Sequence, residues 1–142
     1  MEKKYIAALD QGTTSSRAIL FDAVGGIAAS GQREFKQYYP KPGWVEHDPR
    51  DLLDSLLASW RGALAAGKIK AEEVAAVGIA NQRETVVVWD KYTGKPVYNA
   101  IVWQCRRTAE FCEALKISHK EFLYERTGLP ADAYFSASKI KW

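Results

Sequence analysis

An uninterrupted apolar run, Val74–Ala80, lies near the middle of the sequence and strongly restricts the possible folds. Such a run is typical of a strand buried on both faces, as in the middle of a parallel sheet. Upstream, Asp48 and Pro49 favour a helix start, with Asp as the N-cap and Pro at the first helical position. Gly67 is the expected end of that helix. A strand before this helix and the strand Val74–Ala80 after it, joined by a connection of this length, imply a right-handed crossover and an α/β fold. The helix is expected to bury one apolar face, formed by Leu52, Leu53, Leu56, Leu57, Trp60 and Leu64.

The first part of the sequence predicts an antiparallel meander. An apolar run ends at Asp10, a turn rich in Gly, Thr and Ser follows, and the pair Gly25 and Gly26 signals a hairpin. The expected strands are Tyr5–Leu9, Arg17–Asp22 and Ile27 to about Phe35.

The last part of the sequence predicts two further strands and two helices. The expected strands are Thr85–Trp89 and Val97–Trp103 around a turn at Thr93 and Gly94, and the expected helices are Gln104–Leu115 and His119–Arg126, the second ended by Gly128. A further helix is expected to begin near Ser136. Cys105 and Cys112 would then lie on one helix, too far apart along its axis for a disulfide, and we expect two buried thiols.

Composition is that of an ordinary globular domain. The 142 residues suit one domain, and 47% of them are hydrophobic. The net charge is +3 without a basic run, so nucleic acid is not expected as a partner. No apolar stretch approaches the roughly 20 residues that span a membrane, and no leader-like segment follows Met1–Lys4, so we expect a cytoplasmic protein. His47 and His119 lack partners at metal-ligand spacing and are expected to be structural or exposed.

The stretch from Asp10 to Arg17 is the first candidate site. A carboxylate ends a predicted strand, and Gly12 lets the backbone approach a ligand closely. The hydroxyls that follow, and the guanidinium of Arg17, can bind phosphate oxygens, while Asp10 suits Mg²⁺ held through water. The stretch is not a Walker A loop, because no Gly-Lys follows and the chain enters a strand. A solvated turn without a ligand is the alternative.

Four polar residues, Asn81–Glu84, follow directly on the apolar run and form the second candidate site. Ligands of open α/β sheets bind at the carboxyl ends of parallel strands. Arg83 only donates hydrogen bonds and Glu84 only accepts them, so together they can bind a polyol. The alternative is a surface ion pair worth less than about 1 kcal/mol. Trp103 could offer its ring face to the C–H side of such a ligand, or pack in the core.

Segments along the whole chain share a further pattern. They are Tyr5–Arg17, Tyr39–Pro49, Gly78–Thr85 and Asn99–Thr108, with Thr127–Leu129 and Tyr134–Ser136 extending the pattern almost to the end. Together these segments resemble the start of the glycerol kinases, a branch of the FGGY carbohydrate kinase family. The Asp10–Arg17 and Asn81–Thr85 blocks resemble this branch more than its sugar-kinase relatives.

The resemblance implies a ribonuclease-H-like, actin-like ATPase fold, with three antiparallel strands, then parallel strands and flanking helices. It also implies transfer of the γ-phosphate of ATP to a terminal hydroxyl of glycerol, with Mg²⁺ as cofactor. The implied ATP phosphate contacts are Thr13, Thr14, Ser15 and Arg17, with Asp10 organising Mg²⁺ through water. The implied glycerol contacts are Arg83, Glu84 and Tyr134, with Trp103 as an apolar wall.

The chain departs from the family in length, because family members are several times longer. Their catalytic aspartate, which takes the hydroxyl proton, and their adenine pocket would lie beyond Trp142. Residues 1–142 are therefore expected to be the N-terminal part of the first kinase domain, without a catalytic base or the second domain. Because phosphoryl transfer needs groups on both sides of a cleft, we expect this chain alone to be inactive. The full-length protein is expected to be active and homo-oligomeric.

Three alternatives remain open at this point. The full-length protein could phosphorylate another polyol or a sugar, or the chain could be a binding or folding module without catalysis. A ribonuclease-H-like nuclease is the third alternative. It needs clustered carboxylates at strand ends, for which Asp10 and Glu84 are the obvious candidates.

Overall fold

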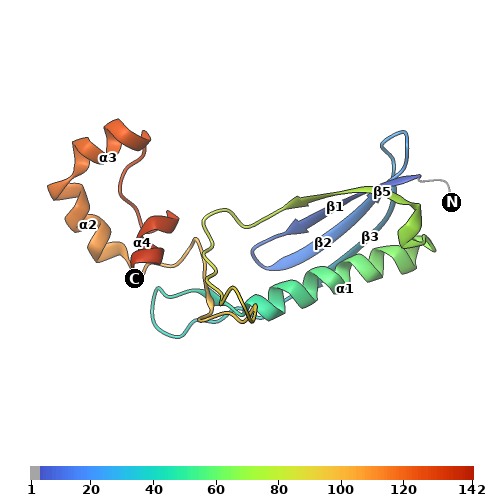
Figure 1. Cartoon of the computed structure of the whole chain (residues 1–142), viewed down its shortest axis with the longest axis horizontal. Coiled ribbons are helices and arrows are strands. Elements are labelled where there is room, and N and C mark those ends of the chain that lie inside the picture. The colour runs from blue at the N-terminus through green and yellow to red at the C-terminus, as the bar shows by residue number, and fades with distance from the viewer. Residues whose placement is uncertain (1–3) are drawn as a thin grey trace. The chain divides into compact units, whose positions relative to one another are not determined.

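The computed structural model describes residues 4–142, and Figure 1 shows them as a ribbon. The chain forms two compact units. The first unit comprises the described residues up to Lys36 together with Asp48–Gln82, and the second comprises Gln37–His47 together with Arg83–Trp142. Each unit has buried residues of its own.

A four-stranded mixed sheet is the scaffold of the first unit, in the order β3-β2-β1-β5. Its strands are β1 (Tyr5–Gln11), β2 (Ser15–Phe21), β3 (Ile27–Glu34) and β5 (Val74–Ala80). Antiparallel pairing joins β1 to β2 and β2 to β3, whereas β5 runs parallel to β1. The predicted meander and mixed sheet are confirmed, although the pairing of β1 with β5 is the only parallel pairing in this sheet within residues 4–142.

The apolar strand β5 lies at an edge of this sheet, so the prediction of a strand buried in the middle is wrong. It pairs with β1 on one side only, and Val74 is the one buried residue that it contains. Val77 and Ile79 are 50% and 70% exposed. The cause is the placement of helix α1 (Pro49–Gly67), which packs chiefly on β2 and β3 and leaves β5 largely uncovered.

Helix α1 begins where the sequence predicts. The carboxylate of Asp48 accepts a hydrogen bond from the backbone N–H of Arg50 at 2.8 Å and so caps the helix. At the other end Gly67 is the last helical residue, and Lys68 stops the helix in the left-handed conformation, with φ of 51°. The chain reaches β5 through a 3₁₀ turn, Ala71–Glu73.

Small residues form the most buried face of α1, so the expected apolar face is wrong in part, although its members Trp60 and Leu64 do pack against the core. Ser55, Ser59 and Ala63 are buried, whereas Leu53 and Leu57 are 57% and 38% exposed. The small face permits a close approach of the helix to the sheet. Around it lies the core of the first unit, formed by Ala7, Ala18, Leu20, Ala63, Ile69 and Val74.

At Gly31 on β3, the backbone of the sheet lies very close to the backbone of α1. A Cβ atom at this position would lie 2.3 Å from the carbonyl oxygen of Ser59 and 2.7 Å from the amide nitrogen of Ala63. The hydroxyl of Ser59 donates to the carbonyl oxygen of Ser16 at 2.9 Å, and the hydroxyls of Ser16 and Ser55 are hydrogen-bonded at 2.7 Å. Only glycine allows this spacing without a shift of the backbone.

The second unit contains little regular sheet. Strand β4 (Glu46–His47) pairs antiparallel with β6 (Ala100–Ile101). The predicted strands Thr85–Trp89 and Val97–Trp103 are wrong as continuous strands, because only single bridges join Val86 to Ile101 and Trp89 to Pro96. Proline has no N–H to donate, which interrupts the ladder at that point.

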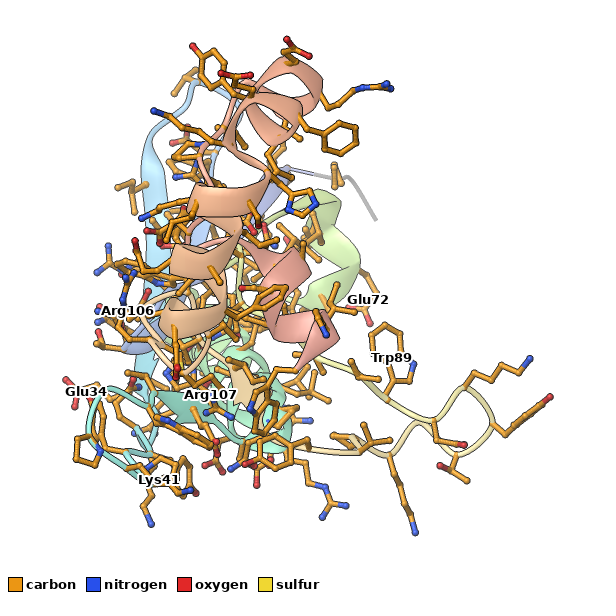
Figure 2. The ribbon with its side chains drawn as sticks, turned by 90° about the vertical axis from the view of Figure 1, so that its left-hand side faces the viewer. Glu34, Lys41, Glu72, Trp89, Arg106 and Arg107 are labelled. Atoms are coloured by element: carbon orange, nitrogen blue, oxygen red, sulfur yellow. The ribbon has the colours of Figure 1, made fainter. Side chains whose placement is uncertain are left out.

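A hairpin carries these bridges, and its tip agrees with the predicted turn. The carboxylate of Asp90 accepts hydrogen bonds from the backbone N–H groups of Tyr92 and Thr93 at 3.0 and 2.7 Å. Gly94 takes a φ of 68°, which glycine adopts without strain. Trp89 on this hairpin is 59% exposed. Its side chain is labelled in Figure 2.

Three short helices complete the second unit: α2 (Ala109–Ser118), α3 (Lys120–Thr127) and α4 (Ser136–Lys141). Gly128 ends α3 as predicted. The helix expected from Gln104 begins only at Ala109, because the N–H groups of Cys105 and Arg106 donate to the carbonyl oxygens of Val102 and Gly43. Arg106 and Arg107 therefore precede α2, instead of opening a helix.

The cysteines and histidines agree with their expected roles in part. Cys105 lies outside any helix, so the argument from helical spacing is wrong, but both cysteines are free and buried. His47 is fully buried and hydrogen-bonded to Gln37 at 2.6 Å, and His119 is exposed at the junction of α2 and α3. Within residues 4–142, no helix has the length and apolar character that a membrane crossing requires.

A buried ion pair joins β4 to the segment before α2. Nη2 of Arg107 lies 2.6 Å from Oε1 of Glu46, and the two side chains are 0% and 4% exposed. Tyr98 and Asn99 donate to the same carboxylate, and the guanidinium lies 3.9 Å from the ring centre of Trp44. Burial opposes ionisation of Glu46, but the hydrogen bonds from its donors outweigh burial and hold the pKa of this carboxyl below its ordinary 4.5.

Candidate functional site

The first candidate site is the turn between β1 and β2 in the first unit. Asp10, near the end of β1, is opposite Arg17 of β2, and both side chains are exposed. Thr13 and Thr14 form the turn, and Ser15 is the first residue of β2. The structure therefore brings together the carboxylate, the hydroxyls and the guanidinium that the sequence predicted to bind phosphate and Mg²⁺.

Backbone contacts fix this turn. A Cβ atom on Gly12 would lie 2.7 Å from the carbonyl oxygen of Ser15, so a side chain here would force the turn open. Nε2 of Gln82, directly after β5, donates to the carbonyl oxygen of Gly12 at 2.8 Å. The turn is thereby tied to the carboxyl end of the parallel strand, where α/β sheets bind their ligands.

Gln32 on β3 organises the polar side chains beside the turn and was missed from the sequence. Its Oε1 accepts hydrogen bonds from Nε and Nη2 of Arg17 at 3.2 and 3.0 Å, and its Nε2 donates to the hydroxyl of Ser15 at 3.0 Å. Gln32 is the register partner of Arg17. Counting outward from the turn at Gly25 would have placed the two within about one residue of each other.

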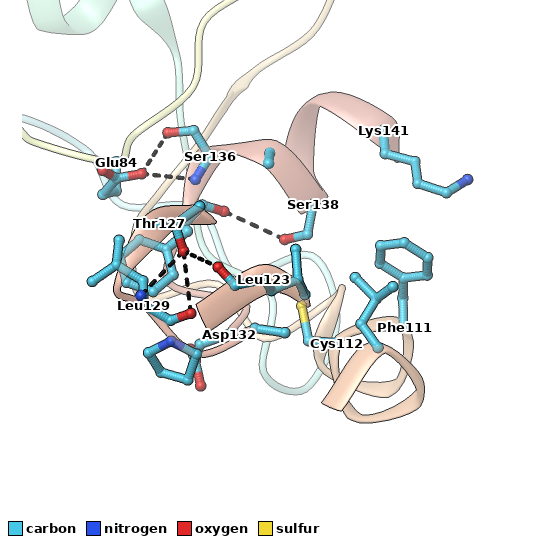
Figure 3. A pocket seen from close by; sticks show the side chains of 15 residues that line it. Glu84, Phe111, Cys112, Leu123, Thr127, Leu129, Asp132, Ser136, Ser138 and Lys141 are labelled. Atoms are coloured by element: carbon cyan, nitrogen blue, oxygen red, sulfur yellow. Dashed lines mark hydrogen bonds between the residues drawn. The ribbon is translucent and has the colours of Figure 1, made fainter. Parts of the chain in front are cut away.

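The second candidate site lies in the second unit and centres on Glu84. Its Oε2 accepts two hydrogen bonds from Ser136, one from the backbone N–H and one from the hydroxyl, each at 2.7 Å (Figure 3). Its backbone has a φ of 63°, which is uncommon for a residue with a side chain. The hydrogen bond from the Ser136 hydroxyl, helped by the charges of Lys139 and Arg83, holds the pKa of Glu84 below its ordinary 4.5.

Arg83 and Glu84 do not form the surface ion pair that was the alternative interpretation. Arg83 is exposed, and none of the ion pairs within residues 4–142 joins it to Glu84. Glu84 instead turns to Ser136, at the start of α4. The guanidinium of Arg83 and Oε1 of Glu84 are thus available to a ligand.

Two aromatic residues predicted to contact the ligand lie against each other. The rings of Trp103 and Tyr134 meet edge to face, with centroids 5.9 Å apart, and Tyr134 also contacts Phe135. The backbone N–H of Trp103 donates to the hydroxyl of Thr85, the neighbour of Glu84, at 3.3 Å. Trp103 follows β6 in a turn instead of ending a strand.

Lys139 is a second residue that sequence reasoning missed. It is 2% exposed, and its ammonium donates to the backbone carbonyl oxygens of Tyr134 and Phe135. Burial lowers the pKa of Lys139, while the negative charge of Glu84 opposes this shift. A lysine spaced three residues from a helix start gives no signal by itself that it folds back onto the preceding carbonyls.

An apolar hollow of about 530 Å³ adjoins this site (Figure 3). Glu84 and Ser136 line one part of it. Phe111 of α2, Leu123 of α3 and residues such as Leu129 in the segment between α3 and α4 line the rest. The hollow has few polar groups, so its chemistry differs from that of the two charged side chains, Glu84 and Arg83.

The carboxylates do not form a multidentate metal site. Residues 4–142 contain no group of three or more His, Cys, Asp or Glu side chains that could hold a metal ion. Asp10 is a single exposed carboxylate at a strand end, which fits Mg²⁺ that keeps several of its waters. The clustered carboxylates that the nuclease alternative requires are not found in the described part of the chain.

Comparison with known proteins decides the family. Residues 5–142 match the N-terminal domain of the FGGY family of carbohydrate kinases. The chain belongs to the FGGY family. It is 59% identical over 140 residues to glycerol kinase 2 of Thermotoga maritima, a match that covers 98% of this chain and 28% of that protein. It is also 59% identical over 142 residues to a glycerol kinase of Aeromonas hydrophila, covering 99% of this chain and 28% of that protein.

Solved structures of FGGY kinases share the fold. A crystal structure of Plasmodium falciparum glycerol kinase with ADP matches with a TM-score of 0.88 at 35% identity, over 99% of this chain and 28% of that one. A ligand-bound xylulose kinase from Lactobacillus acidophilus matches with a TM-score of 0.88 at 24% identity, over 98% of this chain and 28% of that one. The expected actin-like ATPase fold is confirmed. This FGGY chain spans about 28% of the length of these relatives.

Proposed function

We propose that the complete protein containing this chain transfers the γ-phosphate of ATP to a terminal hydroxyl of glycerol. The observation that carries the proposal is a clamped carboxylate, Glu84, beside an exposed Arg83 in a chain 59% identical to glycerol kinases. In this proposal the chain is the N-terminal part of the first kinase domain. A kinase for another polyol or a sugar is the second candidate, favoured by the shared fold of the xylulose kinase.

The second unit would supply the acceptor site. Oε1 of Glu84 accepts a hydrogen bond from a glycerol hydroxyl, and the guanidinium of Arg83 donates to a glycerol oxygen. Trp103 and Tyr134 meet edge to face, and they would form the apolar wall against the C–H side of glycerol. Hydrogen bonds to charged groups are worth about 1.5–3 kcal/mol, so a small ligand can be recognised by few of them.

The first unit would supply the phosphate site. Thr13, Thr14 and Ser15 donate hydroxyl hydrogen bonds to phosphate oxygens, and the guanidinium of Arg17 adds charge. Asp10 would hold Mg²⁺ through water, and this ion would neutralise charge on the phosphates. The general base that takes the proton of the glycerol hydroxyl is expected outside this chain, so the chain alone should not catalyse phosphoryl transfer. We also expect the complete protein to be homo-oligomeric and cytoplasmic.

A coupled kinase assay of the complete gene product tests the proposal. ATP, Mg²⁺ and glycerol should give glycerol 3-phosphate, with kcat/KM for glycerol at least about tenfold above those for xylulose and gluconate. A preference for either sugar substrate would favour the second candidate, and absence of phosphoryl transfer would overturn both. The isolated chain is the matched negative control, because turnover near the roughly 1–100 s⁻¹ of ordinary kinases would place a base within it.

A further inference from the structure

We infer that Ser136 is a positioning residue that fixes the carboxylate of Glu84 and leaves one of its oxygens for a polyol hydroxyl. The inference rests on the proposed function, because it assigns Glu84 to the acceptor site. Both hydrogen bonds from Ser136 reach the same oxygen, Oε2, at 2.7 Å. Within residues 4–142, Oε1 of Glu84 has no hydrogen-bond partner, so the carboxylate is held without being saturated.

The backbone of Glu84 has a conformation that its surroundings must hold in place. A φ of 63° is unfavourable for a residue with a Cβ atom, and such conformations persist where the surroundings determine them. Ser136 supplies two donors from one residue, so it restrains both the position and the rotation of the carboxyl group. A flexible glutamate on a loop would have to lose that freedom when a ligand binds.

The segment that carries Ser136 is itself held from within. The buried ammonium of Lys139 donates to the carbonyl oxygens of Tyr134 and Phe135, directly before Ser136. Ser138 is hydrogen-bonded to Thr108 at 2.8 Å, which anchors α4 independently of Glu84. Tyr134 and Ser136 therefore belong to one fixed segment that presents an aromatic ring and a carboxylate clamp together.

A purely structural role for the same contact is the rival explanation. The backbone N–H of Ser136 is the first amide of α4, and Glu84 could serve only to satisfy it. The hydroxyl of Ser136 separates the two explanations, because satisfying the amide does not require it. Arg83 and Lys139 are the charged groups that act on Glu84, and both remain when the hydroxyl is removed.

The test compares Ser136→Ala with Ser138→Ala in the complete gene product. Ser138 is a buried serine of the same helix whose hydroxyl binds Thr108 and not Glu84, so its loss reports the cost of loosening α4. For Ser136→Ala we expect kcat/KM for glycerol to fall about tenfold while the KM for ATP stays within about twofold. Ser136→Thr keeps a hydroxyl and should recover most of the loss.

A pH profile gives a readout that a structural role would not produce. Removing a donor to the charged carboxylate raises the pKa of Glu84, so the acid limb of kcat/KM for glycerol should move to higher pH in Ser136→Ala. Ser138→Ala should keep the limb of the unaltered protein. Equal losses of kcat/KM in the two variants, or an unmoved limb in Ser136→Ala, would overturn the inference while the kinase activity itself stands.

A second measurement keeps the inference testable if the gene product phosphorylates no polyol. In that case the proposed function fails, and the titration of the Glu84 carboxyl is followed directly by carbon-13 NMR. A higher pKa of Glu84 in Ser136→Ala than in Ser138→Ala supports the clamp. Identical titration curves in the two variants would overturn it.

Discussion

The two units hold their candidate site residues by different means. In the first unit, a helix lies against a sheet through small residues, and the site residues sit on an exposed turn between two paired strands. In the second unit, regular pairing is limited to two-residue strands, and the frame is a buried ion pair with aromatic neighbours. The first unit therefore depends on the small side-chain volume at its helix–sheet interface, and the second unit depends on charge and hydrogen bonds.

This difference determines which substitutions each unit tolerates. A close-packed interface loses stability when one methyl group is added, because the backbone has no room to move. A buried ion pair loses far more when one partner is removed, because the other charge stays buried without compensation. The two kinds of damage can be measured in one protein, by matched variants in each unit.

The largest effect is expected at the buried ion pair. Arg107→Met should lower the free energy of unfolding by about 3–5 kcal/mol, because the carboxylate of Glu46 is left buried with only neutral donors. Glu46→Leu should lower the free energy of unfolding by a similar amount, because it leaves the positive charge of Arg107 buried without its partner. Chemical unfolding followed by tryptophan fluorescence measures the loss, since Trp44 lies against the guanidinium.

The double variant, Glu46→Leu with Arg107→Met, sharpens this prediction. An apolar pair of similar volume removes both charges, so its cost should be well below the sum of the single costs. Glu113→Ala is the control, because its ion pair with Lys116 is exposed on α2 and its loss should leave unfolding unchanged within error. If the losses of unfolding free energy in the double variant were additive, the ion pair would not be what stabilises the second unit.

The next largest effect is expected at the interface of α1 with the sheet. Gly31→Ala should lower the free energy of unfolding by about 1–3 kcal/mol, because the added methyl group meets the backbone of Ser59 and Ala63. The same unfolding measurement applies. The atoms that the added methyl group would meet belong to α1 and not to the site turn, so the hydrogen bond from Gln82 to Gly12 should persist.

Gly62 provides the matched control on the helix itself. A Cβ atom at Gly62 meets nothing within 4 Å, and the residue lies inside α1. Gly62→Ala should therefore stabilise the protein by about 0.4–1 kcal/mol, since alanine loses less backbone entropy in a helix. If both glycine substitutions shift stability in the same direction, close packing at Gly31 is not what limits the first unit.

The same contrast explains which parts of the fold could be predicted from the sequence. Strands β1 to β3, the N-terminus of α1 and the stop at Gly128 follow local rules of alternation, capping and glycine conformation. The burial of β5 does not, because an apolar pattern cannot show which surface covers a strand. The late start of α2 also escapes local rules, since it depends on a hydrogen bond from Arg106 to the distant Gly43.

The candidate site shows the same division at the level of single residues. The residues that would touch ligands, such as Arg17 and Glu84, stand in motifs that the sequence displays directly. Their supports are different: Gln32 and Ser136 act through contacts between separate segments of the chain, and Lys139 folds back onto the carbonyl oxygens of Tyr134 and Phe135. Only register or tertiary packing reveals such residues, and neither can be read from residue type.

A moderate effect is expected at the phosphate turn of the complete gene product. Arg17→Ala should raise the KM for ATP about tenfold, because a charged hydrogen bond to phosphate is lost, and leave the KM for glycerol unchanged. Gln32→Ala should raise it by less, since Arg17 stays but loses its hydrogen-bonded partner. Steady-state kinetics with each substrate varied in turn measures both values.

Arg33→Ala is the control for these two variants. Arg33 is an exposed arginine next to Gln32 on β3, and successive side chains of a strand point to opposite faces. Its removal changes the net charge as Arg17→Ala does, but should not change either KM. A rise in the KM for glycerol in Arg17→Ala would place this arginine at the acceptor instead of the phosphates.

The smallest effect is expected in the pH dependence of stability. The pKa of Glu46 lies below its ordinary 4.5 in the folded protein, so the unfolded chain binds more protons in the interval between the two values. The stability from this carboxylate is therefore complete above the unfolded pKa and is lost as the pH falls through the folded pKa, by at most about 1.4 kcal/mol per pH unit.

Glu46→Gln should be less stable at neutral pH, but the difference in stability from the unaltered protein should narrow on acidification. Glu113→Gln is the matched control, because it replaces a carboxylate in an ion pair that is exposed on α2. A gap for Glu46→Gln that stays constant between pH 7 and about pH 3 would show that the charge on Glu46 does not support the second unit, and that its hydrogen bonds alone do.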